Sequence, residues 1–159
     1  TITLVTVEKF SEAMDKFIAG ECDIVTTDGS ALVGRRAVND ALNDWSIFPT
    51  SPISKEPLGP VYRSNDSMWG DVINWVVYAT IIADEYGVTS ANVDSVDTDA
   101  LPELGRLFGA NDGELQTVMG LSADAFYNVI KQVGNYDEIY SRNLNPVGLF
   151  REGLSLIHI

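Results

Sequence analysis

Asp28 is the residue whose type and position point most directly to chemistry. It follows a run at 22–27 that is rich in β-branched residues and predicts a strand, and it precedes a helical pattern at 29–42. Open α/β proteins bind ligands at such junctions, beyond the carboxyl ends of their strands. A carboxylate there can pair with an ammonium group, and the free N–H groups of the helix start can bind polar groups. Asp is also a common helix N-cap, so a purely capping role stays open.

Three hydroxyl side chains flank Asp28 and can offer hydrogen bonds to a polar ligand: Thr26, Thr27 and Ser30. Side chains alternate along a strand, so Thr26 and Asp28 are expected on one side and Thr27 on the other. Taken singly, each hydroxyl is also explained by solvation or by a hydrogen bond to nearby backbone. The residues alone therefore predict a polar binding junction without identifying its ligand.

The composition excludes several other kinds of chemistry. One Cys and one His in 159 residues are too few for a zinc site or a disulfide framework within the chain, so no metal or cofactor is expected. The single His, His158, is the penultimate residue, where order is least expected, which weakens any Ser-His-Asp hypothesis. A formal net charge of −13 repels phosphate backbones and anionic membrane surfaces. Binding is therefore favoured over catalysis, with neither nucleic acid nor membrane as partner.

The first part of the chain alternates strand-like and helix-like segments. Strands are predicted at 1–7, 22–27 and 45–48, and helices at 10–18 and 29–42. This alternation in short order indicates parallel α/β construction.

A proline-rich segment at 49–60 excludes a continuous helix or a central strand there. We place the crossing between two domains or lobes in this segment, with one domain at 1–57 and the second at 58–159. A long helix is then predicted from its cap Asp66 to Gly87. Apolar residues cover nearly every side of that helix, which predicts burial in a core or beneath a partner. No apolar stretch reaches the ~20 residues that a membrane span needs.

Shorter helices are predicted in the rest of the chain. One lies at 101–108, a clearer one runs from the cap Ser122 to Gly134, and a last one lies at 136–143.

Four separated stretches resemble the polar amino-acid-binding proteins of ABC transporters, in particular their general L-amino-acid branch. They occur in the family's order, and the resemblance covers the chain from its first residue to about residue 154. The stretches are GECDIVTTDGSAL (20–32), ISKEPLGPV (53–61), GVTSANVD (87–94) and YNVIKQVGNYDEIY (127–140).

The resemblance implies an α/β, periplasmic-binding-protein-like (type II) fold of two lobes, of which this chain would be the C-terminal half. Residues 1–57 would then be the later part of lobe two. Residues 58–159 would return to lobe one, with a helical excursion at 88–134. The family's members are periplasmic, carry a signal peptide in full-length form, and are not enzymes. They bind a polar L-amino acid of the glutamate, glutamine, aspartate and asparagine class and deliver it to a membrane permease.

The family's site residues transfer by position to two residues of this sequence. Asp28 would accept the ligand's α-ammonium group, and Thr27 would line its side-chain pocket. The physical argument and the resemblance agree on Asp28, whereas Thr27 rests mainly on the resemblance. The sequence departs from the family at Gly29, where relatives commonly carry Gln or a basic residue, and over 152–159. The difference at Gly29 is expected to affect which ligand side chains the site selects.

Two other classes of function stay open from the sequence. An enzyme on the same fold, such as a hydrolase or lyase, would need a nucleophile or acid near Asp28. A ligand-sensing receptor domain would bind the same ligands and continue into a membrane helix. Ligand binding without turnover separates a transport protein from the enzyme, and genomic linkage to a permease separates it from the receptor.

Overall fold

The computed structural model divides into two compact units along the chain, Thr1–Ile53 and Ser54–Ile159. Part of the predicted proline-rich crossing, and the divergent tail 152–159 with His158, lie outside the described residues. The structure describes residues 2–40, 44–49, 51, 53–54, 58–110 and 114–151.

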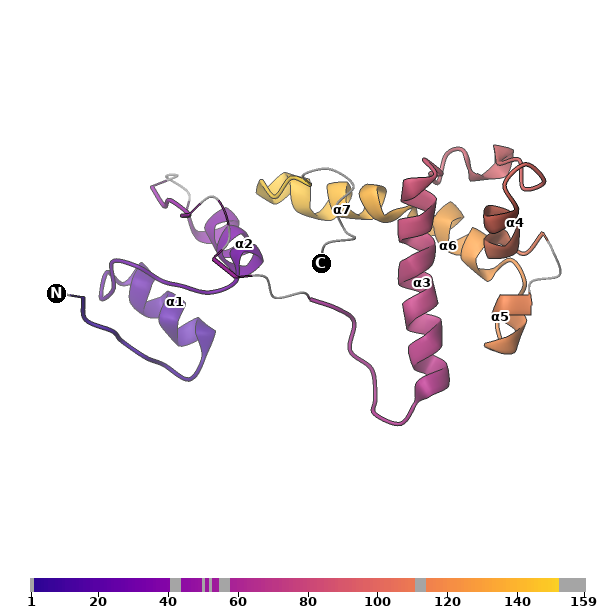
Figure 1. Ribbon diagram of the computed structural model, residues 1–159. Coiled ribbons are helices and arrows are strands. Elements are labelled where there is room, and N and C mark those ends of the chain that lie inside the picture. Colours follow the sequence, from indigo (N-terminus) through magenta and orange to yellow (C-terminus); the bar gives the residue numbers. More distant parts are fainter. Residues whose placement is uncertain are drawn as a thin grey trace. The chain divides into compact units, whose positions relative to one another are not determined.

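Two helices form the regular structure described in the first unit (Figure 1). They are α1, Phe10–Ile18, and α2, Gly29–Asn39. α1 buries Met14, and Gly20 follows it with a φ of 74°, as expected for a glycine that ends a helix. α2 ends earlier than predicted, and 41–43 lie outside the described residues.

The three predicted strands are not formed in the described part of this unit. The segments 2–7, 22–27 and 45–48 have no strand assignment, and no described backbone hydrogen bond joins one of them to another. Because a strand is held by a ladder of hydrogen bonds to a neighbour, alternation alone does not make one. The unpaired apolar side chains stay in solvent, with Ile2 95% and Leu4 81% exposed. The prediction of strands is therefore wrong for these residues.

The second unit is built on the long helix α3, Ser67–Glu85 (Figure 1). Its predicted start is confirmed, because the Asp66 side chain accepts a hydrogen bond of 3.2 Å from the backbone N–H of Trp69. α3 packs against α6, Ala125–Val133, and α7, Tyr136–Leu144.

The remaining helices close a small apolar core around α3 and α6. They are η1, Val93–Ser95; α4, Pro102–Phe108; α5, Glu114–Val118; and η2, Asn145–Val147. α4 contacts both α5 and α6. The buried core residues are Ala79, Ala83, Val88, Val93, Leu104, Leu107, Phe108, Phe126 and Ile130.

The predicted helix cap at Ser122 is wrong. α6 begins at Ala125, and the residue before it is Asp124. Ser122 instead belongs to the preceding turn, where its carbonyl accepts a hydrogen bond of 3.0 Å from the N–H of Ala125. Its side chain also hydrogen-bonds Asp124 and, with Asn128, lowers the pKa of the Asp124 carboxyl. The turn at 123–124 therefore separates Ser122 from the first residue of α6.

Two of the stretches that carry the resemblance meet in the second unit. The Asn135 side-chain amide donates to the carbonyl of Val88 at 2.8 Å. The Glu138 carboxylate accepts from the N–H and the hydroxyl of Ser90 at 3.0 and 2.6 Å. Asn135 and Glu138 also form a capping box at the start of α7. These residues therefore join the loop after α3 to α7.

We expect the free energy of unfolding of Glu138→Gln to depend less on pH in the acid range than that of the wild type. Burial raises the pKa of the Glu138 carboxyl, but hydrogen bonds from Ser90 and Asn135 outweigh it, so the net pKa lies below the ordinary 4.5. A lowered folded-state pKa contributes stability above the ordinary pKa, and that stability is lost as the pH falls through the lowered value. Removing the charge should lower the free energy of unfolding at pH 7 by about 1–3 kcal/mol.

Urea unfolding of the complete protein between pH 3 and pH 7 measures this effect. Glu103→Gln is the matched control, because the Glu103 carboxylate accepts a hydrogen bond from Tyr86 at the exposed surface. It should change the free energy of unfolding far less. If the free energy of unfolding of Glu138→Gln fell with decreasing pH as steeply as that of the wild type, this carboxylate would not stabilise the loop.

We also expect this chain by itself to associate in solution. Large apolar side chains are exposed in both units, and in the second unit Val61 is 94%, Met68 64% and Trp69 53% exposed. Exposed apolar area on this scale favours self-association. Light scattering should report a mass that rises with concentration, together with binding of the dye ANS. A stable monomer that does not bind ANS would contradict this expectation.

Candidate functional site

Asp28 occupies the N-cap position of α2, with φ −55° and ψ 139°. Its backbone carbonyl accepts the first hydrogen bond of the helix, from the N–H of Leu32 at 3.0 Å. Its side chain is exposed and makes no capping hydrogen bond. Capping therefore does not occupy the Asp28 carboxylate, which is open to another partner.

The flanking hydroxyl side chains alternate in exposure along the chain. Thr27 is half-buried, whereas Thr26, Asp28 and Ser30 are exposed. Of these four residues, Thr27 is the one that the first unit partly covers. Thr27 and Asp28 are consecutive residues before α2, but Thr27 is half-buried and Asp28 is exposed.

Two aromatic contacts link α1 to other parts of the first unit. The ring of Phe17 on α1 meets Trp45 edge-on at a centroid distance of 5.0 Å. The guanidinium of Arg35 on α2 lies 5.6 Å from the ring centre of Phe10 on α1, within the range of a cation–π contact. The Arg35 contact joins α2, the helix that follows Asp28, to α1, and the Phe17 contact joins α1 to the segment after α2.

Neither a metal centre nor a membrane span emerges from the described residues. No group of three His, Cys, Asp or Glu side chains lies together there as potential metal ligands. Among the described helices, none combines the length and the apolar character needed to cross a membrane.

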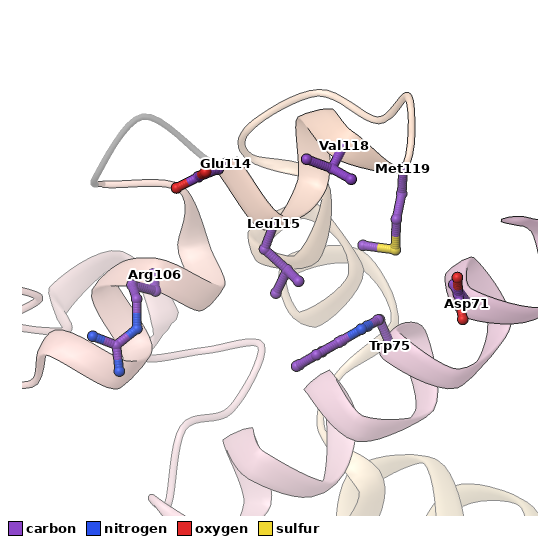
Figure 2. Close-up of a pocket in the computed structure, with 7 residues that line it drawn as sticks. All are labelled: Asp71, Trp75, Arg106, Glu114, Leu115, Val118 and Met119. Carbon is purple, nitrogen blue, oxygen red and sulfur yellow. The ribbon is translucent and has the colours of Figure 1, made fainter.

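A second candidate site, which the sequence did not indicate, is a groove in the second unit (Figure 2). Its volume is about 710 Å³, within the range of ligand-binding clefts. No local pattern could have predicted it, because its residues come from α3, α4, α5 and the residue after α5. The lining residues are Asp71, Trp75, Arg106, Glu114, Leu115, Val118 and Met119.

Comparison with known proteins finds relatives that match most of this chain. The General L-amino acid-binding periplasmic protein AapJ of Rhizobium johnstonii is 42% identical over 141 residues, which cover 88% of this chain and 41% of AapJ. The Glutamate/glutamine/aspartate/asparagine-binding protein BztA of Rhodobacter capsulatus is 41% identical over 155 residues, 95% of this chain and 45% of BztA. No protein-family profile matches the chain.

A solved structure shares the fold. An ABC transporter periplasmic binding protein from Brucella ovis, with glutathione bound, superimposes with a TM-score of 0.82 at 40% identity. The match covers 92% of this chain and 47% of that protein. The chain thus spans less than half the length of each of these proteins.

These matches confirm the predicted type II periplasmic-binding-protein fold and the predicted periplasmic location. The chain is a homologue of the periplasmic amino-acid-binding proteins of ABC transporters and carries the fold of the part of them that it matches.

Proposed function

We propose that this chain belongs to the substrate-binding component of an amino-acid ABC transporter. The complete protein would bind a polar L-amino acid between two lobes and deliver it to a membrane permease. The names of AapJ and BztA, at 42% and 41% identity, support an amino-acid ligand. The BztA name further supports the glutamate, glutamine, aspartate and asparagine class.

The observation that carries this proposal is the exposed, uncapped carboxylate of Asp28 at the start of α2. An α-amino acid has an ammonium group that needs an opposing charge once lobe closure removes it from water. We assign that role to Asp28 and assign Thr27, which is half-buried beside it, to the pocket for the ligand's side chain. The N-terminal N–H groups of α2 would lie near the same polar ligand.

The two units fit a division between lobes. In this proposal residues 1–57 belong to lobe two and carry the ligand contacts. Residues 58–159 return to lobe one, and the helical excursion at 88–134 supplies η1, α4, α5 and α6. The division of the structure after Ile53 supports a boundary in the proline-rich segment.

A second ligand is favoured by one specific observation. The Brucella ovis protein, 40% identical, holds glutathione. Glutathione begins with a γ-linked glutamate whose α-ammonium and α-carboxylate are free, so Asp28 would recognise it as it recognises glutamate.

Calorimetric titration of the complete protein tests the proposed function. Glutamate, glutamine, aspartate, asparagine and glutathione are the ligands, and D-glutamate is the control for recognition of the α-carbon. At least one L-ligand should bind with a stoichiometry of one and be recovered unchanged by NMR. Turnover of the ligand would favour the enzyme on this fold, and a gene continuing into a membrane helix would favour the receptor domain. Binding of none would overturn the proposal.

A further inference from the structure

Asp28 is followed by a glycine, and this pair has a chemistry of its own beyond ligand binding. In an Asp-Gly pair the backbone nitrogen of the glycine can attack the aspartate side chain and form a cyclic imide. Other residues hinder this attack because their side chains shield the nitrogen, whereas glycine has no Cβ atom and permits a close approach. In a folded protein the reaction then depends on whether both reacting groups are free.

The Asp28 carboxylate is free to react in the described structure. Its side chain is exposed and makes no capping hydrogen bond, and none of the described ion pairs includes it. Asp66, at the start of α3, shows the contrast, because its carboxylate accepts a hydrogen bond from the N–H of Trp69 and is held in place. No contact of this kind among the described residues has to be broken before the Asp28 side chain can turn.

The Gly29 nitrogen is equally accessible. Gly29 is the first residue of α2, where N–H groups have no acceptor within the helix, and its N–H makes no hydrogen bond to any described residue. A Cβ atom at Gly29 would meet nothing within 4 Å, so the space around the pair is open. Ring closure requires a rotation from the present ψ of 139° at Asp28, which opens the first turn of α2. That turn has no side-chain cap to resist opening.

We propose that Asp28 and Gly29 form an isomerisation site, whose reaction inactivates the proposed amino-acid site as the protein ages. The nitrogen of Gly29 bonds to Cγ of the protonated Asp28 carboxyl, and the N–H proton leaves with the carboxyl hydroxyl as water. Water then opens the resulting succinimide ring. Opening at Cγ restores aspartate, whereas opening at the main-chain carbonyl carbon gives isoaspartate, so no other reactant is needed.

Isoaspartate at this position would be a poor substitute for aspartate. The chain then runs through Cγ, which adds one carbon to the backbone before α2, and the free carboxylate is attached directly to Cα. Both changes move the negative charge away from the point where it would meet the ligand's ammonium group, and an ammonium group buried without its partner is costly. This consequence rests on the proposed function of Asp28, whereas the reaction itself does not.

Incubation of the complete protein for several weeks, followed by peptide mapping, tests the proposal. Electron-transfer fragmentation distinguishes isoaspartate from aspartate at each position, which separates Asp28 from the other Asp-Gly pair of the sequence, at 112–113. Isoaspartate should accumulate at Asp28 at least about tenfold faster than at Asp23, an exposed aspartate of the same unit that is followed by Ile24. Saturation with the amino acid that titration identifies should slow the reaction, because lobe closure would hold the carboxylate.

Gly29→Ala is the matched variant, because the added Cβ atom has room and shields the nitrogen. It should form isoaspartate at Asp28 roughly tenfold more slowly than the wild type, and it should lose less affinity on ageing, each protein being compared with its own fresh sample. In Asp28→Asn the same attack releases ammonia instead of water, so mass spectrometry and isoelectric focusing should show a slow return of negative charge.

Three results would count against this account in different ways. Isoaspartate that forms at Asp28 no faster than at Asp23, or equally fast in Gly29→Ala, would overturn the isomerisation site. Isomerised protein that keeps the affinity of the fresh sample would overturn the inactivation. Rapid isomerisation of a protein that binds no amino acid even when fresh would support the isomerisation site and overturn the proposed function instead.

Discussion

Asp28→Asn in the complete protein should weaken amino-acid binding by roughly 30- to 5,000-fold while leaving the fold intact. Lobe closure desolvates the ligand's ammonium group, which then depends on the Asp28 carboxylate. Removing one partner of a buried, hydrogen-bonded charge pair costs on the order of 2–5 kcal/mol, which corresponds to that loss of affinity. Calorimetric titration with the ligand that the wild type binds measures it.

The substitution Asp28→Asn separates a binding role of Asp28 from a capping role. Asn caps helices about as well as Asp, so a residue that only capped α2 would show little change in stability or affinity on this substitution. Asp23→Asn is the matched control, because Asp23 is an exposed carboxylate in the same unit and its loss changes the net charge equally. Unchanged affinity in Asp28→Asn would place the ammonium site elsewhere.

Gly109→Ala should lower the free energy of unfolding by about 2–5 kcal/mol. Gly109 ends α4 with a φ of 79°, a left-handed conformation that costs a residue with a Cβ about 1–2 kcal/mol. A Cβ atom there would also overlap the carbonyl oxygen of Ala123 and lie 2.6 Å from its carbonyl carbon. Because those atoms are backbone, the turn before α6 would have to move, at a further cost of about 1–3 kcal/mol.

Gly120→Ala isolates the contribution of this overlap. Gly120 has a similar φ of 74°, but a Cβ atom there would meet nothing within 4 Å. It should therefore cost about 1–2 kcal/mol, from backbone conformation alone. Urea unfolding of the two variants gives the difference directly. Equal losses would show that α4 and the Ala123 turn are not packed as closely as the structure has them.

The helices were predictable where local signals coincide with their ends. Asp66 caps α3 as expected, and Gly134 follows α6 as expected, because caps act on backbone groups a few residues away. The strands were not predictable from the same kind of signal. Alternation at 2–7 and 22–27 describes side-chain pattern, whereas a sheet needs a paired neighbour that local sequence does not specify.

The two candidate sites also differ in how far local sequence could predict them. Asp28 could be predicted from sequence because three local signals indicate it: its residue type, its position before a helix and a family resemblance. Its assignment to a ligand remains a proposal, supported by an uncapped carboxylate. The groove around Trp75 was missed because Asp71, Arg106 and Met119 are far apart in the chain and adjoin through the packing of α3, α4 and α5.

The most direct measurement is a crystal structure of the complete protein bound to the L-amino acid that titration identifies. We expect a carboxylate oxygen of Asp28 within hydrogen-bond distance, about 3 Å, of the ligand's α-ammonium nitrogen, with Thr27 beside the ligand's side chain. A bound amino acid whose ammonium group is held by other residues, with Asp28 facing solvent, would contradict it.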